Sequence, residues 1–358
     1  MNKKFSQFKY LDKIHRLRDG KIDRHNKIRL DANERVSPFD KSFIRLIKNK
    51  INSNYFTAYP EVDSLYNLLG KKLRCKKENI FLTSGSDTAM KHCFEVFTKP
   101  KSKIITLEPT FGMVNVYAKL FQTRQIKINF DKKLQLNFNK LLVSINKNIS
   151  MIMFANPNSP TGTVLNNKDI IKVLKKAKKN KCFVIIDEAY FGFYNKSFLP
   201  FTKKFNNLII LRTFSKAYGL AGIRCGYIVS KKENIEKLYK FRPMYEINSL
   251  AVLLAEETLK DDKILQRYVK ETEKGKKYLL KELKFLNLQY YKTFANFILV
   301  NFHTKKMQLK VFKYLHKNKI LVRFPPNIKA CQNYLRFTLG PLKYMKILTQ
   351  NLSKILKT

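Results

Sequence analysis

Two apolar runs separated by a helical segment constrain the fold of this chain more than any other feature. Residues 151–155 and 182–186 are continuous apolar runs of strand length, and residues 168–179 between them have the pattern of a helix. A strand, a helix and a second strand covered on both faces form a βαβ unit with parallel strands. The sequence therefore predicts an α/β fold with a mostly parallel central sheet between helices.

Polar side chains follow these predicted strands at the point where each strand ends. Asn156 comes directly after the first run, Asp187 directly after the second, and Tyr190 lies shortly beyond. A third apolar run, residues 208–211, leads to Lys216. Open α/β sheets bind their ligands at the carboxyl ends of the strands. We therefore expect these side chains to line one ligand site.

Lys216 stands in a stretch, RTFSKAYGLAGIRCGY, that is rich in small and apolar residues. A lysine amine attacks carbonyl groups well only when desolvation or a neighbouring cation lowers its pKa, and Arg224 offers the cation. The stretch therefore favours Schiff-base chemistry. A solvated surface lysine is the alternative because lysine is abundant here, but the neighbours Ser215 and Ala217 argue against it.

Two earlier loops add candidate binding groups. The segment TSGSD turns from a short predicted strand, residues 80–82, into a helix that Ser86 and Asp87 would cap. Such a helix start presents free N–H groups and suits a phosphate, although any capped helix after a strand looks similar. Phe111 lies in the loop after the strand predicted at residues 103–107, where its ring would either stack on a ligand or pack in the core.

The pattern changes after Arg242-Pro243. A mostly helical segment, residues 246–284, is followed by strand-like runs at residues 297–302, 319–324 and 334–339. Helices followed by strands suggest a separate α+β unit. We predict three parts: residues 1–50 as an N-terminal arm or part of a small domain, 51–243 as the large ligand-binding domain, and 244–358 as the small α+β domain.

Arg323 and Arg336 lie on or beside two of these late strands. Burying an arginine costs free energy unless a neighbouring anion compensates its charge. Each arginine is therefore either half of a structural ion pair or a binding group for an anionic substrate.

The charge balance raises nucleic acid or an anionic membrane as a partner, because Lys and Arg outnumber Asp and Glu by 72 to 26. The lysines are spread over almost every predicted helix, and Asn and Ile are also plentiful. Codon bias on solvated faces explains this pattern, so we expect neither a nucleic-acid nor a membrane partner. A non-enzymatic, anion-binding protein remains the competing hypothesis.

Cysteine and histidine spacing argues against a metal site. The five cysteines include no CxxC pair, and the five histidines have no metal-ligand spacing. We expect reduced cysteines and no metal. The first residues, MNKKFSQFKYLDK, lack the apolar core of a signal peptide, so we expect a cytoplasmic protein.

The motifs GSD, NPNSPTG, DEAY and TFSKAYGLAGIRCG follow one another in this order along the chain. In order and spacing they resemble the fold-type I aminotransferases of class I/II, over nearly the whole chain. Within that group, LDANE, AYP and the ending ILVRF and YLRFTLG are most similar to the histidinol-phosphate aminotransferases. The resemblance implies a pyridoxal-phosphate-dependent transaminase. Its amino donor would be histidinol phosphate or a related anionic amine, and its exchange partner 2-oxoglutarate or glutamate.

The resemblance also implies roles for single residues. Lys216 would form the Schiff base, Asp187 would face the pyridine nitrogen, Asn156 and Tyr190 would meet the ring hydroxyl, and Phe111 would stack on the ring. The phosphate would be held by Ser86, Asp87, Thr213, Ser215 and Arg224, joined by Tyr59 from the second subunit of a homodimer. Arg336 would bind the substrate α-carboxylate, Arg323 the distal group, and Asn33 would belong to the N-terminal substrate contacts.

The chain also departs from the family pattern. Asn33-Glu34 is followed by Arg35-Val36, and no tyrosine precedes Leu30 closer than Tyr10. These departures leave two alternatives open, an aromatic or other amino-acid aminotransferase and a phospho-amino-acid decarboxylase on the same fold.

Overall fold

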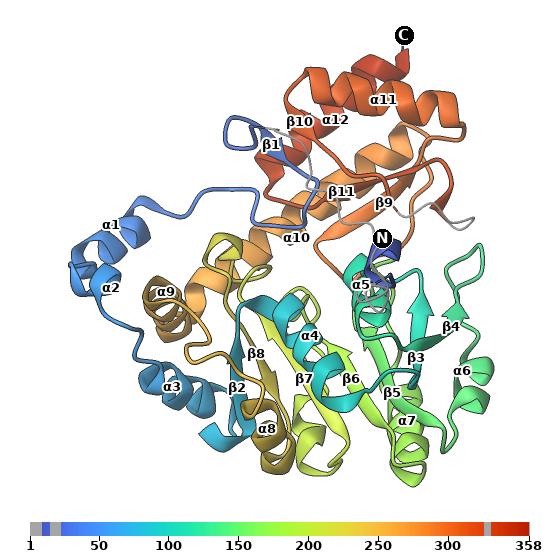
Figure 1. Ribbon diagram of the computed structural model, residues 1–358. Coiled ribbons are helices and arrows are strands. Elements are labelled where there is room, and N and C mark those ends of the chain that lie inside the picture. The colour runs from blue at the N-terminus through green and yellow to red at the C-terminus, as the bar shows by residue number, and fades with distance from the viewer. Residues whose placement is uncertain (1–8, 15–22, 326–330, 358) are drawn as a thin grey trace.

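The computed structural model describes residues 9–14, 23–325 and 331–357 and is built around a seven-stranded sheet (Figure 1). The strand order is β2-β8-β7-β6-β5-β3-β4. The strands are β2 (Ile80–Thr83), β3 (Lys103–Glu108), β4 (Arg124–Asn129), β5 (Ile149–Ala155), β6 (Phe183–Asp187), β7 (Leu208–Thr213) and β8 (Gly226–Val229). Every strand pair in this sheet is parallel except the two pairs made by β8.

The predicted βαβ unit is confirmed. β5 and β6 pair in parallel, with Ala155 opposite Asp187, and α7 (Asn167–Lys179) connects them. β4 was not among the predicted strands, although its alternating residues RQIKIN have the period of a strand with one covered face. It also did not predict that β8 runs antiparallel, because an apolar run carries no signal of its direction.

Helices cover both faces of the sheet, as predicted. α4 (Gly85–Phe97), α5 (Gly112–Leu120) and α8 (Lys232–Tyr239) pack on one face, against Phe81, Met153 and Ile228. The opposite face is covered by α3 (Asp63–Leu73), α6 (Phe138–Ser144), α7 and α9 (Ser249–Lys260). Successive strand residues point to opposite faces, so the buried strands must be apolar on both sides.

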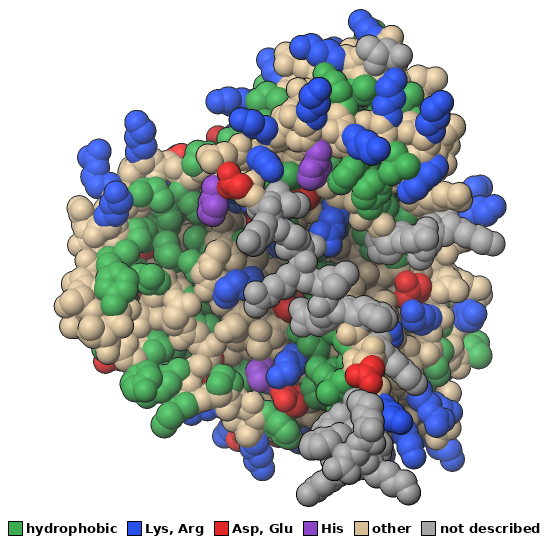
Figure 2. All heavy atoms as spheres, turned by 45° about the horizontal axis from the view of Figure 1, so that its top comes forward, with side chains coloured by type: hydrophobic (Ala, Val, Ile, Leu, Met, Phe, Trp, Pro, Cys, Tyr) green, Lys and Arg blue, Asp and Glu red, His purple; other side chains and the backbone are tan. Residues whose placement is uncertain are grey.

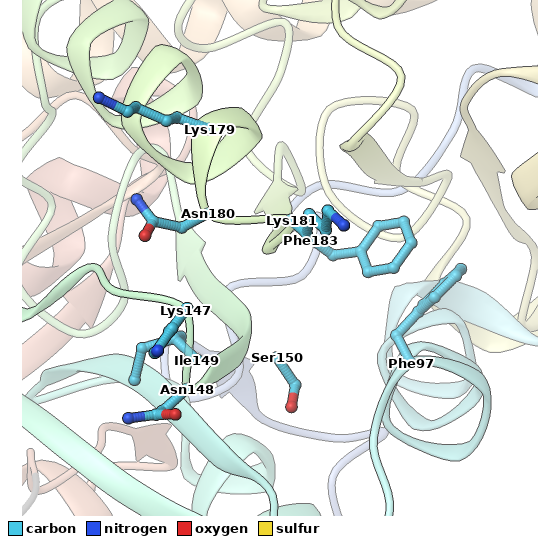
Figure 3. A pocket seen from close by; sticks show the side chains of 9 residues that line it. All are labelled: Phe97, Lys147, Asn148, Ile149, Ser150, Lys179, Asn180, Lys181 and Phe183. Atoms are coloured by element: carbon cyan, nitrogen blue, oxygen red, sulfur yellow. The ribbon is translucent and has the colours of Figure 1, made fainter.

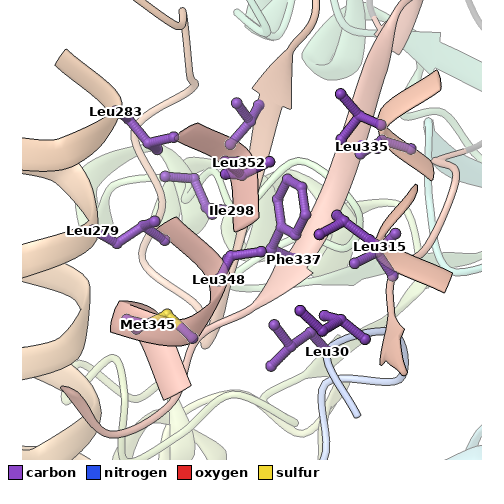
Figure 4. Packing of buried hydrophobic residues seen from close by; sticks show 14 of the residues in the cluster. Leu30, Leu279, Leu283, Ile298, Leu315, Leu335, Phe337, Met345, Leu348 and Leu352 are labelled. Atoms are coloured by element: carbon purple, nitrogen blue, oxygen red, sulfur yellow. The ribbon is translucent and has the colours of Figure 1, made fainter. Parts of the chain in front are cut away.

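A second, smaller hydrophobic core lies above one edge of the sheet (Figures 1 and 4). It is formed by α10 (Asp262–Phe285), α11 (Lys305–Lys317), α12 (Leu342–Lys357), the antiparallel pair β9 (Phe297–Asn301) and β11 (Tyr334–Thr338), and the parallel pair β1 (Ile28–Arg29) and β10 (Ile320–Leu321). Leu30, directly after β1, is fully buried in this core. The N-terminal segment is therefore held by the C-terminal part of the chain.

The remaining elements are short or connect these bodies. α1 (Lys41–Lys50) packs Phe43 and Ile47 against Leu253 of α9, and α2 (Asn54–Thr57) follows it. The 3-10 turns are η2 (Leu11–Lys13), η3 (Lys77–Asn79), η4 (Leu199–Lys203) and η5 (Ala221–Ile223). Within the described residues, no helix is both long and apolar enough to cross a membrane.

The three-part division of the chain stays a prediction. Parts of the predicted N-terminal arm, residues 1–8 and 15–22, lie outside the described residues. α9 shares a core with Leu65 of α3 and Tyr227 of β8, although it lies beyond residue 243. We therefore propose that the large body continues through α9 and that the small body begins in α10.

Gly275 lets α10 touch the turn between β11 and α12. A Cβ at this position would collide with the carbonyl oxygen of Gly340, a backbone atom that cannot rotate away. We expect Gly275→Ala to lower the free energy of unfolding by about 2 kcal/mol or more, measured by urea denaturation. Gly112→Ala is the matched control, because a Cβ at this helical glycine meets no atom within 4 Å. Equal effects of the two substitutions would contradict this account of the packing.

Candidate active site

The carboxyl ends of β5, β6 and β7 bring the predicted polar residues to one edge of the sheet. Asn156 follows β5 and Asp187 ends β6, and the Asn156 N–H donates to the Asp187 carbonyl oxygen at 2.9 Å. The Asn156 Oδ1 accepts from the Leu165 N–H at 2.9 Å, which orients the side chain within its loop. Both residues are buried. The edge is therefore preorganised by strand pairing before any ligand binds.

Asp187 is a buried carboxyl group with a perturbed pKa. Its Oδ1 accepts from the Ala189 N–H at 3.0 Å. Burial raises the Asp187 pKa to about 7, while that hydrogen bond and the nearby Lys216 charge act in the opposite direction. With this pKa the carboxyl group is only partly ionised near neutral pH, and a neighbouring cation would favour its ionised form, so the position suits a positively charged ligand group.

Glu188, next to Asp187, anchors the turn that follows β6. Its Oε2 accepts from the Nη2 of buried Arg212 at 2.9 Å, and its Oε1 accepts from the Phe198 N–H at 2.6 Å. The guanidinium lies 3.5 Å from the centroid of the Phe191 ring. This ion pair was not predicted from the sequence, because Glu188 and Arg212 are 24 residues apart in the chain.

Lys216 points from the loop after β7 toward the N-terminal segment. Its Nζ donates to the Ala32 carbonyl oxygen at 3.0 Å. Burial lowers the Lys216 pKa to about 8, and the Arg336 and Arg224 charges add to the effect. Roughly a tenth of the amine is therefore unprotonated at pH 7 and about half at pH 8, and the unprotonated form is the one that attacks carbonyl groups.

Tyr190 and Asn33 form a buried hydrogen-bonded pair across the site. The Asn33 Nδ2 donates to the Tyr190 Oη at 3.0 Å. The Asn33 backbone N–H donates to the Thr338 Oγ1 at 3.0 Å, and the Asn296 Nδ2 donates to the Asn33 carbonyl oxygen at 3.2 Å. Asn33 has a φ of 55°, a conformation that asparagine tolerates better than most residues. Burial raises the Tyr190 pKa.

Arg336 on β11 faces the same site with spare donors. Its Nη2 donates to the Asp31 carbonyl oxygen at 2.6 Å, and its guanidinium carbon lies 5.5 Å from the centroid of the Phe297 ring. Its buried Nε has no hydrogen-bond partner in the described structure. Burial lowers the Arg336 pKa, and the charge of Arg323 lowers it further. An incoming carboxylate would satisfy this donor in a bidentate pair.

Arg323 pairs with Arg336 through two backbone hydrogen bonds. The Arg323 N–H donates to the Arg336 carbonyl oxygen at 3.2 Å, and the Arg336 N–H donates to the Arg323 carbonyl oxygen at 2.8 Å. Arg323 as a whole is exposed, unlike Arg336. Two guanidinium groups therefore meet at this edge, one half-buried and one open to solvent.

The predicted phosphate-binding residues gather at the start of α4. The Arg224 Nη1 approaches the Ser215 Oγ, and its Nη2 approaches the Ser84 carbonyl oxygen, both at 3.4 Å. The Thr213 Oγ1 donates to the Ser215 Oγ at 3.0 Å. Gly85 has a φ of 83°, and a Cβ there would lie 2.7 Å from the Arg224 Nη2. Glycine is thus required for the guanidinium to reach the helix start.

Ser86 and Asp87 occupy the first turn of α4, and the N-cap is Ser84, so the prediction that Ser86 and Asp87 cap this helix was wrong. The Asp87 Oδ1 accepts from the hydroxyl of Tyr117 in α5 at 2.9 Å. Tyr117 is a residue that the sequence analysis missed, because nothing in the pattern of α5 marks its hydroxyl. Phe111 precedes α5 and is 40% exposed, so its ring is presented at the surface rather than packed in the core.

Tyr59 lies on an exposed surface. It is 74% exposed, and its ring stacks on Tyr245 with a centroid separation of 4.1 Å. Its described contacts do not join it to Lys216. Arg35, the residue that departs from the family pattern, lies over the rings of Phe39 and Tyr268 at 4.4 and 4.3 Å. Arg35 is therefore a packing residue.

The residues of this edge fit pyridoxal phosphate. Asp187 needs a positive partner, which the protonated nitrogen of the pyridine ring would supply. Arg224, the serine and threonine hydroxyls and the N-terminus of the 13-residue helix α4 form a donor set for a phosphate. In the described part of the chain, no cluster of His, Cys, Asp or Glu could hold a metal ion.

Comparisons with known proteins agree with this chemistry. The family described as "Aminotransferase class I and II" matches residues 26–352. The histidinol-phosphate aminotransferase of Clostridium novyi is 33% identical over 88% of this chain and 87% of its own length. That of Pyrococcus furiosus is 34% identical over 89% of each chain. The structure of the Sinorhizobium meliloti histidinol-phosphate aminotransferase with pyridoxal-5'-phosphate has a TM-score of 0.86 at 21% identity, covering 99% of this chain and 98% of that one.

The lowered Lys216 pKa predicts a distinct reactivity in the cofactor-free protein. An amine with a pKa of about 8 is mostly neutral above that pH, whereas an ordinary lysine stays charged to about pH 10. We expect an amine-acylating reagent, used in limiting amount, to label Lys216 at a rate that reaches half its maximum near pH 8. The labelled fraction of each lysine would be measured by peptide mass spectrometry. Exposed Lys306 on α11 is the internal control, and Arg336→Gln should move the Lys216 midpoint upward. Identical pH profiles for the two lysines would contradict the assignment.

Proposed function

The chain belongs to the family of class I and II aminotransferases, and from this premise we propose that it transfers the amino group of histidinol phosphate, or of a closely related anionic amine, to 2-oxoglutarate. The enzyme is an aminotransferase with pyridoxal phosphate as its cofactor, and its substrates are small molecules. The predicted fold and family are thereby confirmed. The choice of donor and acceptor, the site roles and the dimer are proposals.

One observation carries the choice of donor, namely the two guanidinium groups of Arg336 and Arg323 at one edge of the site. Arg336 holds a buried unpaired donor, and the Arg323 charge lowers its pKa. Two neighbouring cations favour a substrate with a doubly charged group. We assign Arg336 to the α-carboxylate of amino-acid substrates such as glutamate, and Arg323 to the phosphate of histidinol phosphate, which itself carries no carboxylate. The curated relatives with 33% and 34% identity carry the same substrate in their names.

When bound, pyridoxal phosphate supplies an aldehyde that takes up amines covalently and a ring that withdraws electrons from the substrate Cα. Lys216 would anchor it. With its pKa lowered to about 8, the Lys216 Nζ can take a proton from the substrate Cα and return it. Asp187 would keep the ring nitrogen protonated, while Asn156 and Tyr190 would hold the ring hydroxyl.

Other residues would orient the cofactor. Arg224, Ser215, Thr213 and Ser86 would hold its phosphate at the start of α4, with Asp87 fixed by the Tyr117 hydroxyl. The exposed ring of Phe111 would stack on the pyridine. Glu188 and Arg212 would keep the Asp187 turn in place through their buried ion pair.

The N-terminal segment would control access to Arg336 and Lys216. The carbonyl oxygens of Asp31 and Ala32 accept from these two side chains. Asn33 fixes the segment to Tyr190 and Thr338. A substrate carboxylate would compete with the Asp31 carbonyl for Arg336, and the segment would then shield the bound substrate from water.

We also propose that the working unit is a homodimer. Phe56, Tyr59, Met244 and Tyr245 are exposed aromatic or apolar residues, with Phe56 70% and Met244 80% exposed. Figure 2 shows hydrophobic side chains gathered on the side where α1 and α2 lie in Figure 1. A second copy of the chain would cover this surface and bring Tyr59 to the phosphate of the other site.

Removing the Asp187 charge should impair catalysis strongly, because the ring nitrogen loses the group that keeps it protonated. We expect Asp187→Asn to lower kcat by about a hundredfold or more, measured in steady-state transamination with saturating cofactor. Asp262→Asn, at an exposed carboxylate, should leave kcat unchanged. Turnover within a few-fold of the parent would mean that another residue faces the pyridine.

A donor panel would test the two arginines. We expect histidinol phosphate to have a higher kcat/KM than phosphothreonine, glutamate, aspartate and phenylalanine. Arg336→Ala should weaken all amino-acid donors by about thirtyfold or more, because a buried charge pair is lost. Arg323→Ala should mainly weaken histidinol phosphate. The phosphate assignment fails if phenylalanine is the best donor and Arg323→Ala leaves its kcat/KM unchanged.

Subunit mixing would test the shared site. Tyr59→Ala and Lys216→Ala should each be inactive alone. After the two are unfolded together and refolded, up to about one site in four should be intact, because a mixed dimer places both mutations in the same site. The recovered activity would show that each active site uses residues of both subunits. Light scattering would show whether the protein is a dimer. A fully active monomer would rule the shared site out.

A further inference from the structure

A buried carboxylate that the proposed reaction does not use lies beside the start of α4. Glu246 is only 6% exposed and stands in the loop between α8 and α9, residues 240–248. Its Oε1 accepts from the Arg242 Nη1 at 3.1 Å and from the Tyr66 Oη at 3.4 Å. Burial raises the pKa of Tyr66, so its hydroxyl stays protonated and can donate. Two side chains therefore fix the position of Glu246.

Tyr66 also holds the strand that leads into α4. The Leu82 N–H of β2 donates to the Tyr66 Oη at 3.1 Å. The Tyr66 ring is buried in one core with Leu69 of α3 and Tyr227 of β8. A single hydroxyl group on a packed ring thus joins β2 to the loop that carries Glu246.

The backbone of the same loop contacts both sides of the predicted phosphate site. The Ser84 Oγ donates to the Glu246 carbonyl oxygen at 3.0 Å. The Ser84 carbonyl oxygen in turn accepts from the Arg224 Nη2 at 3.4 Å. The Asn248 Nδ2 donates to the carbonyl oxygen of Ile223, directly before Arg224, also at 3.4 Å. The loop therefore supports the N-cap of α4 and the cation that faces it.

The Ser84 hydroxyl does not cap its own helix. A serine at the N-cap usually accepts from an N–H of the first helical turn. In the described structure Ser84 makes no such bond, and its hydroxyl donates to the Glu246 carbonyl oxygen instead. The contact with Glu246 thus leaves the first-turn N–H groups of α4 to an anion.

The far end of α4 is anchored by aromatic packing. Phe97 is the last residue of the helix, and its ring centroid lies 4.4 Å from that of Phe183 on β6 (Figure 3). The two residues border a surface hollow of about 470 Å³. This packing fixes the helix against the sheet, whereas the polar groups at its start take their orientation from hydrogen bonds. The bond between Ser84 and Glu246 is one of these.

We propose that Glu246 is a positioning residue for the cofactor phosphate. The inference rests on the proposed function, in which the phosphate lies at the start of α4. Arg242 and Tyr66 fix the Glu246 side chain and with it the Glu246 carbonyl group. That carbonyl group orients Ser84, and the Ser84 carbonyl group orients the guanidinium of Arg224. Glu246 thus acts through these two residues and does not touch the cofactor.

The test compares pyridoxal phosphate with pyridoxal, which has the same aldehyde and ring but no phosphate. The cofactor is removed from the holoenzyme with hydroxylamine, and the Kd of each compound is measured by titration, from the visible absorbance of the bound ring. A loss that affects only pyridoxal phosphate is a loss at the phosphate. A general weakening of the fold would affect both compounds.

Three variants change the network, and one is a matched control. Glu246→Ala removes the side chain, Glu246→Gln keeps an acceptor for Tyr66, and Tyr66→Phe removes only the hydroxyl. Glu257→Ala is the control, because Glu257 on α9 is also 6% exposed and forms ion pairs with Lys50 and Lys260. Circular dichroism checks the fold of each variant.

We expect Glu246→Ala to raise the Kd of pyridoxal phosphate by about tenfold, which is the order of affinity that one well-placed hydrogen bond supplies. The Kd of pyridoxal should stay unchanged. Glu246→Gln should lie between Glu246→Ala and the parent. Tyr66→Phe should act in the same direction, and it tests the proposal if Glu246→Ala does not fold. Glu257→Ala should change neither Kd.

Arg224→Gln separates this inference from the proposed function. If Arg224→Gln leaves the Kd of pyridoxal phosphate unchanged, the phosphate does not lie at the start of α4 and both proposals fail. If Arg224→Gln raises this Kd but Glu246→Ala and Tyr66→Phe do not, only the positioning role is wrong. Equal weakening of both compounds by Glu246→Ala, or an equal effect of Glu257→Ala, would show that Glu246 serves the fold alone.

Discussion

The burial of Asp187 beside Lys216 is the constraint on which the site depends. Parallel pairing of β5 and β6 places Ala155 opposite Asp187, and the following turn is held by Glu188 and Arg212. The sheet thereby removes a carboxyl group from water and raises its pKa to about 7. The same burial lowers the Lys216 pKa to about 8. A cationic cofactor ring between these groups would restore the charge of the acid and leave the amine free to react.

The small body contributes to this site through the N-terminal segment. β1 pairs with β10, Leu30 fills the small core, and the next residues cross to the sheet edge. There the Asp31 and Ala32 carbonyl groups meet Arg336 and Lys216. A few residues therefore connect the small core to Lys216 of the large body. Arg336 on β11 belongs to the small body together with Asp31, so a movement of the small body relative to the sheet must change the hydrogen bond of Lys216.

Sequence reasoning could place Asn156, Asp187 and Lys216 because parallel strands put their carboxyl ends at one edge, whatever the surrounding contacts are. It could not find the bond between Asn33 and Tyr190, or that between Ala32 and Lys216, since each joins segments more than 150 residues apart. Arg323 illustrates the same limit. A strand pattern suggested that it was buried, whereas the residue is exposed.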